Sequence, residues 1–269
     1  MGGFESITPW PDASHAHLLP GTPAAAPLVR PHPAAYHQYM SDRPRPRRRT
    51  RLVADLLLVV GGLVLAFPFW SAAYTHYQQG RLGRTYAARA AAFGAVARAA
   101  SAATQAQRDP VAHMQRLANL YRRQTRPGEP IGRLVIARIG VNEIVTQGST
   151  GRGSLSPHSD VGYLRGGPVH YGVTPLPGQG QPFAVAGHRT TYGAPFYRLD
   201  QLRRGDRIVV TTPYGRFTYR VAKLTRVPPS DVGVLADRGY GLVLTTCDPP
   251  YSASHRLIVW GRSAGFSFR

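Results

Sequence analysis

Three side chains in the C-terminal half of the chain could together carry out nucleophilic chemistry. Cys247 is the only cysteine among the 269 residues, so it can form no disulfide within the chain and is a free thiol. A cysteine nucleophile needs a base or ion-pair partner, and a group that holds the substrate carbonyl oxygen as it gains charge. His188 lies upstream and Arg256 lies nine residues downstream, and these residue types could meet both needs.

Each of these residues is expected where a strand meets a loop. Cys247 ends the apolar run GLVLTTC and precedes the turn-rich sequence DPPYSASH, and Arg256 begins the next run. His188 follows the apolar run PFAVAG and begins the loop RTTYGAP. Each residue also has a plain alternative role: a cysteine buried for packing, a structural histidine, and a surface arginine paired with Asp248.

From Ile131 onward the sequence reads as short β-strands separated by Gly and Pro turns. Pro213-Tyr214-Gly215 predicts a hairpin, and one short helix is expected over Pro195–Leu202. The expected strands cover Gly132–Ile139, Val141–Val145, Phe183–Gly187, Asp206–Thr211, Arg216–Val227, Gly241–Cys247 and Arg256–Trp260. Seven or eight such strands predict a mainly β fold, a closed seven- to eight-stranded barrel with short helices over residues 131–269.

The first half of the chain predicts a tail and a membrane anchor. Residues 1–51 are rich in Pro, Ala and His and end in an arginine cluster, so we expect a disordered basic tail. Residues 52–74 are apolar except for Asp55 and a few small polar residues, and a helix of this length crosses a hydrocarbon core of about 30 Å. A buried core helix and a cleaved signal peptide are the alternatives, and the arginines and the long tail disfavour them.

A helical stalk is expected between the anchor and the barrel. Residues 75–130 are expected to form this stalk and a linker, because residues 80–123 are dominated by Ala, Arg and Gln, which favour helix, and offer little apolar stripe to bury. Asp109-Pro110 should break this helix and start a second one. The positive-inside rule keeps the tail cytoplasmic, so the chain from residue 75 onward is expected outside the membrane.

The net charge of +20 favours anionic partners. Residues 1–130 hold 16 basic and 6 acidic residues, and residues 131–269 hold 17 and 7, so each part carries +10. Lipid headgroups, phosphate-bearing wall polymers and nucleic acid would all suit this charge. No clustered aromatic-plus-basic motif is present, so we do not expect nucleic-acid binding.

The amino-acid sequences of these motifs resemble those of the sortase family of cysteine transpeptidases. LTTC, the arginine nine residues later and the upstream AGHRTTYGAPF match that family's order of histidine, TLxTC-type strand and arginine. IGRLVIARIGV resembles its first strand, and residues 167–208 resemble class E sortases of actinobacteria. Asp248 departs from class E, which often carries histidine there. A carboxylate beside the thiol disfavours the thiolate, so Asp248 should point away or pair with a cation such as Arg256.

The resemblance implies a mechanism and a substrate class. Cys247 and His188 would form a thiolate–imidazolium pair, and Arg256 would orient the peptide and stabilise the oxyanion. The substrates would be surface proteins with a C-terminal Leu-Ala-x-Thr-Gly-type sorting signal, cleaved after Thr through a thioacyl intermediate. A cell-wall precursor amine, lipid II-like, would resolve that intermediate. Further peptide contacts are expected from Thr245, Thr246 and Tyr192.

No cofactor or metal is expected. A site built from Cys247, His188, His170 and His255 matches no zinc spacing, and the carboxylates are too scattered for calcium. His170 is expected instead to shape the loop beside the site. An L,D-transpeptidase would place histidine and cysteine close together, whereas 59 positions separate them here. A membrane-tethered barrel that binds anionic wall polymers without chemistry remains the alternative function, although such a binder needs none of the three reactive residues.

Overall fold

The computed structural model describes residues 48–102, 109–149, 161–180 and 182–269. The chain divides into two units, Met1–Leu57 and Leu58–Arg269. Of the first unit, residues 48–57 are described, and they are helical. The expected disordered tail lies almost wholly outside the described residues, as do residues 103–108 of the expected stalk.

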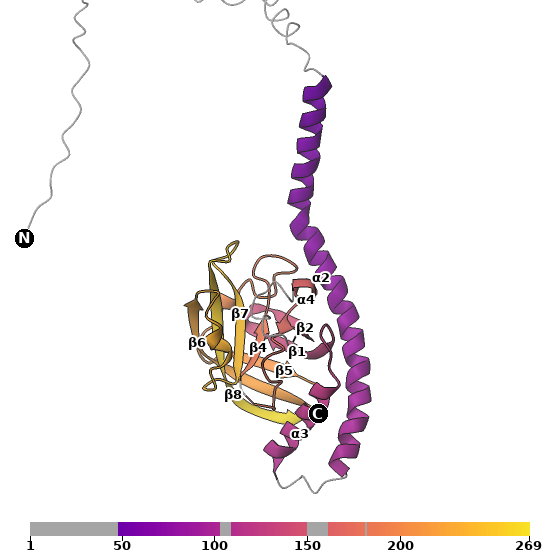
Figure 1. Ribbon diagram of the computed structural model, residues 1–269, viewed down its shortest axis with the longest axis vertical. Coiled ribbons are helices and arrows are strands. Elements are labelled where there is room, and N and C mark those ends of the chain that lie inside the picture. Colours follow the sequence, from indigo (N-terminus) through magenta and orange to yellow (C-terminus); the bar gives the residue numbers. More distant parts are fainter. Residues whose placement is uncertain (1–47, 103–108, 150–160, 181) are drawn as a thin grey trace, which may run out of the picture. The chain divides into compact units, whose positions relative to one another are not determined.

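Among the described residues of the second unit, eight strands close into a barrel (Figure 1). They are β1 Pro130–Ile136, β2 Val141–Gln147, β3 Val169–His170, β4 Phe183–Ala186, β5 Arg207–Thr211, β6 Gly215–Val227, β7 Leu242–Asp248 and β8 His255–Phe268. Their order around the barrel is β1-β2-β3-β4-β7-β8-β6-β5, and β5 pairs with β1 to close it. The expected mainly β, closed barrel is therefore confirmed.

The elements differ from expectation at several places. The first strand ends at Ile136 rather than Ile139, because Ala137–Ile139 form the 3₁₀ turn η2. β8 continues to Phe268 rather than ending at Trp260, because the long β6 supplies it with a partner along almost its whole length. β3 has two residues, too few to leave a periodic signal in the sequence. The expected helix over Pro195–Leu202 is reduced to the 3₁₀ turn η3, Leu199–Gln201.

The hairpin at Pro213-Tyr214-Gly215 is confirmed. β5 and β6 pair antiparallel across it, with Thr211 opposite Arg216. The Thr212 hydroxyl donates to the Gly215 carbonyl at 3.0 Å, which satisfies a buried acceptor in the turn.

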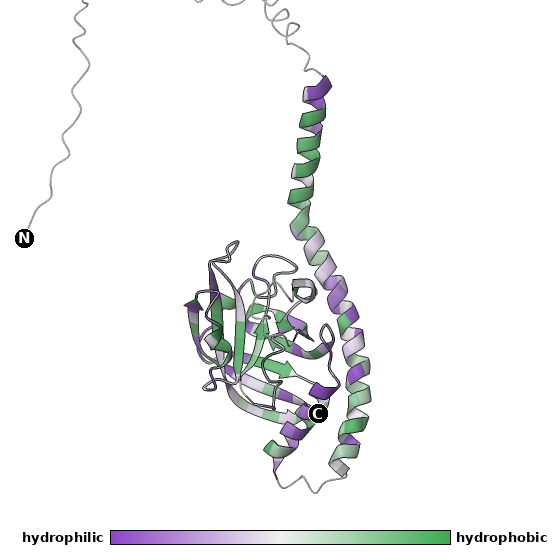
Figure 2. Cartoon of the chain, in the orientation of Figure 1, coloured by the Kyte–Doolittle hydropathy of each residue, from purple (hydrophilic) through white to green (hydrophobic). Residues whose placement is uncertain are grey.

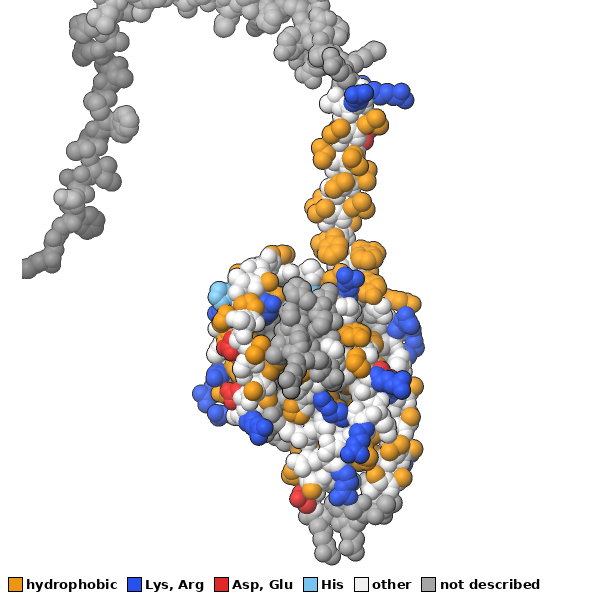
Figure 3. Space-filling model, in the orientation of Figure 1, with side chains coloured by type: hydrophobic (Ala, Val, Ile, Leu, Met, Phe, Trp, Pro, Cys, Tyr) orange, Lys and Arg blue, Asp and Glu red, His pale blue; other side chains and the backbone are white. Residues whose placement is uncertain are grey.

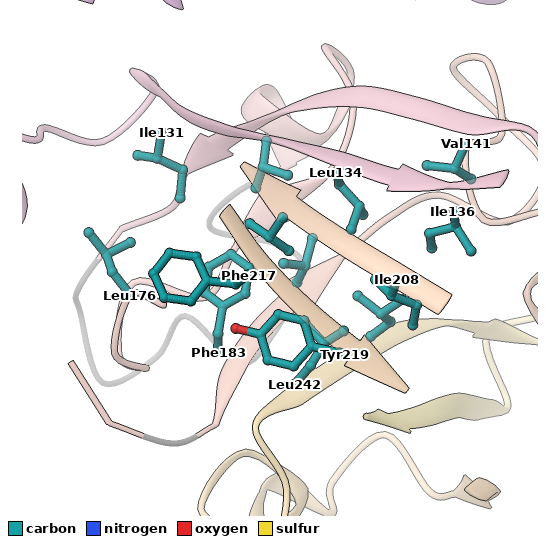
Figure 4. Close-up of a cluster of buried hydrophobic side chains, with 14 of the residues drawn as sticks. Ile131, Leu134, Ile136, Val141, Leu176, Phe183, Ile208, Phe217, Tyr219 and Leu242 are labelled. Carbon is teal, nitrogen blue, oxygen red and sulfur yellow. The ribbon is translucent and has the colours of Figure 1, made fainter. Parts of the chain in front are cut away.

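Side chains from many strands meet inside the barrel. Alternate residues of a strand point to opposite faces, so one set from each strand turns inward. Figure 4 shows this cluster, whose labelled members are Ile131, Leu134, Ile136, Val141, Leu176, Phe183, Ile208, Phe217, Tyr219 and Leu242. Burying a side chain of this size contributes roughly 1.5–3 kcal/mol, so this cluster is a large source of stability for the domain.

Three helices precede or interrupt the barrel strands: α2 Arg48–Ala102, α3 Pro110–Arg123 and the short α4 Val161–Leu164. The predicted restart at Asp109-Pro110 is confirmed, since the Asp109 carboxylate accepts from the backbone N–H of Val111 at 2.9 Å and of Ala112 at 3.1 Å. The early turns of α2 are apolar (Figure 2), and within the described ranges this is the one helix long and apolar enough to cross a membrane.

The expectation that residues 80–123 bury little apolar surface is wrong. Phe93 of α2 joins the barrel core together with Met114, Leu117 and Tyr121 of α3. The rings of Phe93 and Tyr121 meet edge to face, with centroids 5.0 Å apart. A few bulky residues at helical spacing suffice, because alanines between them allow close approach. The Tyr86 hydroxyl also donates to the Thr211 carbonyl at 2.9 Å.

Candidate functional site

Cys247 of β7 and Arg256 of β8 lie in one row with His188, which follows β4 by two residues. In the antiparallel β7–β8 ladder, Cys247 is directly opposite Arg256. In the parallel β4–β7 ladder, Ala186 is opposite Thr245, and two further residues along each chain bring His188 level with Cys247. Adjacent strands are about 4.8 Å apart, so the backbones at His188 and Arg256 flank that of Cys247 on its two sides.

All three residues of this row are half-buried, neither sealed in the core nor fully exposed. The Arg256 guanidinium donates through Nη1 to the carbonyls of Ala253 and His255, at 3.0 and 3.1 Å. These bonds hold the guanidinium against the loop that joins β7 to β8. Its remaining N–H groups are available as donors in a planar fork, the geometry that suits a carbonyl or an oxyanion.

Strand alternation decides which neighbours share the thiol's face. Leu242 and Leu244 of β7 point into the barrel core, whereas Val243 belongs to a second cluster with Ile258 and Trp260 on the outer face. Because the side chains of a strand alternate between its two faces, Thr245 and Cys247 lie on the outer face. Thr246 and Asp248 lie on the inner face.

A pocket lies on this outer face beside the row. Thr245 and Arg256 line it, and the segment over residues 228–235, which includes the 3₁₀ turn η4 (Val232–Leu235), forms its wall. Tyr171 also lines the pocket, and its hydroxyl is 2.8 Å from that of Thr245. Sequence reasoning missed Tyr171, whose only signal was its place next to His170. The pocket is small, about 30 Å³, and Arg256 is the residue of the reactive row that lines it.

Thr246 occupies the opposite face. It is buried, and its hydroxyl donates to the Gly187 carbonyl at 2.8 Å. The backbone N–H of Gly187 donates in turn to the Thr245 carbonyl at 3.1 Å. Thr246 thus ties β7 to the residue that precedes His188, and the geometry favours Thr245 over Thr246 for contact with a peptide.

The His188 imidazole is set up to exchange a proton. Its Nε2 is buried and has no hydrogen-bond partner among the residues that the structure describes. Burial lowers the pKa of His188 below its ordinary value, and the nearby charge of Arg165 lowers that pKa further. The neutral imidazole is therefore favoured, and it can take a proton from a neighbouring thiol.

A protein-family model of the sortase domain matches residues 134–264. Sortase E1 of Streptomyces coelicolor is 41% identical over 90 residues, which cover 30% of this chain and 26% of that protein. Sortase E2 of the same organism is 34% identical over 89 residues, 29% of this chain and 35% of that protein. The chain is thus aligned with about a quarter to a third of the length of these curated relatives. The solved sortase E of Streptomyces avermitilis is 36% identical and covers 53% of this chain and 93% of that structure, with a TM-score of 0.44.

The chain belongs to the sortase family. Its likeness to sortases E1 and E2 also agrees with the resemblance of its motifs to class E.

Asp248 of this sortase is paired with cations, as expected, but not with Arg256. Its carboxylate lies 2.7 Å from Nε of Arg226 and 3.6 Å from Nη1 of Arg189. Because Asp248 follows Cys247 on the strand, it occupies the opposite face, where Arg256 does not reach. Sequence reasoning also missed Arg189, although its place directly after His188 was a signal.

The loop that carries His188 also contacts helix α2. The Tyr192 ring lies 5.3 Å from the imidazole of His188 and meets the Phe67 ring edge to face at 6.1 Å. The Thr75 hydroxyl donates to the Arg165 carbonyl at 2.9 Å. Tyr192 has φ of 51°, so the loop turns sharply here. In this sortase the loop that follows His188 therefore packs against helix α2.

His170 is a core residue of the sortase. It is fully buried and stacks on Phe183, and burial lowers its pKa to about 3. Its Nδ1 is 3.0 Å from Oε1 of Gln147, and its Nε2 is 2.9 Å from the Thr174 hydroxyl. Both ring nitrogens are thus engaged, which leaves none for a metal. Within the described ranges, no group of three or more His, Cys, Asp or Glu residues is arranged to hold a metal ion.

Proposed function

We propose that this sortase is a membrane-anchored cysteine transpeptidase acting on Leu-Ala-x-Thr-Gly-type sorting signals. It would cleave each signal after Thr and join the surface protein to a cell-wall amine. The observation that carries the proposal is the row formed by His188 just after β4, Cys247 on β7 and Arg256 on β8. This row supplies a nucleophile, a proton carrier and a fixed cation at one strand edge.

In the first half-reaction, His188 takes the thiol proton and Cys247 attacks the Thr carbonyl carbon. The carbonyl oxygen gains charge, and the Arg256 fork stabilises it. The C–N bond then breaks, and His188 returns its proton to the departing Gly amine. The product of this half-reaction is a thioester between Cys247 and the Thr carbonyl.

In the second half-reaction, the wall amine attacks the thioester carbonyl. His188 accepts a proton from the amine and gives it to the departing sulfur, so Cys247 is regenerated as a thiol. The new bond is an amide. An amine must therefore compete well against water, and the half-buried position of Cys247 restricts the access of water.

The peptide would lie on the outer face of the barrel. The pocket beside the row would receive its side chains, with Thr245 as a contact. Tyr192, beside the imidazole, would contact the peptide from the other side of the thiol. Thr246 would contribute by holding the β4–β7 edge rather than by touching the peptide.

The membrane arrangement rests on α2. Side chains between Leu52 and Trp70 are largely exposed and apolar, and Figure 3 shows them in orange with Arg side chains in blue at the start of the helix. We assign the tail over residues 1–51 to the cytoplasm, the span to residues 52–74 and the helical linker to residues 75–130. The catalytic domain over residues 131–269 would face outward, since basic residues flank cytoplasmic ends.

The test uses the full chain in detergent with a fluorogenic Leu-Ala-x-Thr-Gly peptide and a glycine-peptide amine. Cys247→Ala should abolish turnover, and His188→Ala and Arg256→Ala should each lower kcat/KM by about 100-fold or more. Arg262→Ala, an exposed arginine on the same strand, is the matched control and should leave turnover unchanged. Undiminished cleavage by Cys247→Ala would falsify the proposal.

Mass spectrometry separates the enzyme from the alternative, a non-catalytic barrel that binds anionic wall polymers. Quenching the enzyme with peptide but without amine should leave the peptide acyl group on Cys247, the only cysteine. A protein that binds wall polymer but never carries this acyl group would be the non-catalytic binder.

A further inference from the structure

A buried ion pair joins the residues that follow the nucleophile and the histidine. Arg189 comes directly after His188, and Asp248 comes directly after Cys247. Nη1 of Arg189 lies 3.6 Å from Oδ1 of Asp248. The side chains are 2% and 8% exposed, respectively, so both charges are shielded from water. Buried charges require partners, and this requirement constrains where the two backbones can lie.

Two further charges extend the pair at its ends. Nη2 of Arg189 lies 3.1 Å from the carboxylate of Asp200 in η3, and Nε of Arg226 near the end of β6 lies 2.7 Å from Asp248. The four charges sum to zero. Asp200 and Arg226 are 43% and 64% exposed, so water screens the outer contacts more than the inner one. The Arg189–Asp248 contact is therefore the best shielded of the three, although at 3.6 Å it is an ion pair without a hydrogen bond, and Nη1 and Nε of Arg189 have no hydrogen-bond partner among the described residues.

The pair lies behind the reactive row rather than in it. Alternation along β7 puts Asp248 on the opposite face from Cys247, and Arg189 is buried while His188 is half-buried. Neither side chain therefore faces the outer surface where the substrate would lie. The pair can act on the reaction only through the positions and the charge that it gives to His188 and Cys247.

The charge balance also bears on the thiol. An uncompensated carboxylate next to Cys247 disfavours the thiolate, whereas an uncompensated guanidinium favours it. Among the described residues, the neighbouring strand positions add His188 after β4, and His255 and Arg256 on β8. Loss of Arg189 removes one of two cations from Asp248, whereas loss of Asp248 removes the carboxylate partner of Arg226 and leaves Arg189 paired with Asp200 alone. The two losses therefore change the net charge beside the thiol in opposite directions.

We propose that Arg189 is a positioning residue of this sortase, which holds His188 level with Cys247 through its buried pair with Asp248 and cancels the charge of that carboxylate. The proposal rests on the proposed function, because it assigns Arg189 a role in the same reaction. It explains how a chain with aspartate directly after its nucleophile can still form a thiolate.

The experiment compares Arg189→Gln, Arg189→Lys, Asp248→Asn and the Arg189→Gln/Asp248→Asn double variant, as full chains in detergent. We expect Arg189→Gln and Asp248→Asn each to lower kcat by about 10–100-fold with little change in KM, the loss typical of misplaced reacting groups. Arg189→Lys should recover part of the loss. The double variant should be no worse than the poorer single variant, because both changes break one contact.

The second readout is the rate of Cys247 alkylation by iodoacetamide as a function of pH. The pH at which the alkylation rate reaches half its maximum should rise in Arg189→Gln and fall in Asp248→Asn. If Arg189 and Asp248 served only to stabilise the fold, the two variants would not shift the alkylation midpoint in opposite directions. Because Cys247 is the only cysteine, the signal has one source. Should Arg189→Gln fail to fold, Arg189→Lys and Asp248→Asn still give the kcat and alkylation comparisons.

The matched control is the more exposed pair Arg138–Asp206, whose Nε and Oδ2 lie 3.0 Å apart. Arg138→Gln and Asp206→Asn should leave both kcat and the alkylation midpoint unchanged. Unchanged kcat in Arg189→Gln, or midpoints that move the same way in both single variants, would overturn the positioning role. A wild-type chain that cleaves no peptide would instead overturn the proposed function, so the two failures are distinct.

Discussion

Cys247 and Arg256 are direct cross-strand partners in the β7–β8 ladder. Their side chains therefore project from the same face of the sheet. A slip of one residue in this ladder would turn one of them to the opposite face and separate the thiol from its cation. The Asp248–His255 pair directly after it and the Thr246–Leu257 pair directly before it hold this register.

The first prediction concerns the shape of the cation at this position. Arg256→Lys keeps the charge but removes the planar fork, so it should lower kcat/KM by about tenfold or more while remaining more active than Arg256→Ala. Peptide cleavage assays with both variants measure this order. Equal activity of Arg256→Lys and wild type would show that a point charge is enough. Arg262→Lys, on the same strand, serves as the control.

The second prediction concerns the proton on His188. The charge of Arg165 contributes to the lowered pKa of His188, so Arg165→Gln should raise that pKa toward its ordinary value. His188 would then keep its proton to a higher pH. NMR titration of labelled histidine measures the shift, with His188→Asn to assign the signal. Arg165→Lys retains the charge and should keep the lower pKa. If the pKa of His188 is the same in Arg165→Gln as in wild type, burial alone lowers it.

The third prediction concerns stability at acid pH. Burial lowers the pKa of His170 from 6.5 to about 3. Between these values the unfolded chain binds a proton at this residue that the folded chain does not. Stability should therefore fall as pH drops below 6.5, by about 1.4 kcal/mol per pH unit from this residue.

Thermal unfolding followed between pH 7 and 4 tests this contribution. His170→Gln can still bond Gln147 or Thr174 but cannot titrate, so its stability should depend less steeply on pH than that of wild type. His255→Gln, at an exposed position, should retain the wild-type slope. Identical slopes in wild type and His170→Gln would assign the acid sensitivity to other groups.

The fourth prediction concerns the contact between α2 and the histidine loop. Gly193 has φ of 72°, and a Cβ there would lie 3.3 Å from Cγ2 of Thr75. Gly140 has nearly the same φ, 74°, with open space around it. Gly140→Ala should cost about 1 kcal/mol of stability through its backbone alone. Gly193→Ala should cost more and should also lower peptide cleavage, because the loop that carries His188 must shift.

A second substitution tests the cause of that loss. Thr75→Ser removes Cγ2 and keeps the hydroxyl that bonds the Arg165 carbonyl. Combined with Gly193→Ala, it should restore part of the lost cleavage. A Gly193→Ala variant as active as Gly140→Ala would show that helix α2 and the histidine loop are not coupled.

The elements that depend on local chemistry could be read from the sequence. Alternating and apolar runs mark strands, Pro213-Tyr214-Gly215 marks a hairpin, and Asp109-Pro110 marks a helix start, because each signal acts over a few neighbouring residues. The three reactive residue types at strand ends were visible for the same reason. Bulky residues within the alanine-rich helices were harder to interpret, since nothing local shows which side of a helix meets a barrel.

The sequence alone determined which functional elements are present. They are one thiol, a histidine and an arginine at strand ends, and an apolar helix preceded by a cluster of arginines. Tertiary structure decided which parts meet. β7 lies between β4 and β8, so Cys247 stands level with residues that come before and after it in the chain. The same packing pairs Asp248 with Arg189 rather than Arg256. β7 and β8 are consecutive strands, but the contacts of β7 with the His188–Arg189 segment join parts of the chain 59 positions apart, and these form only when the barrel closes around its shared core.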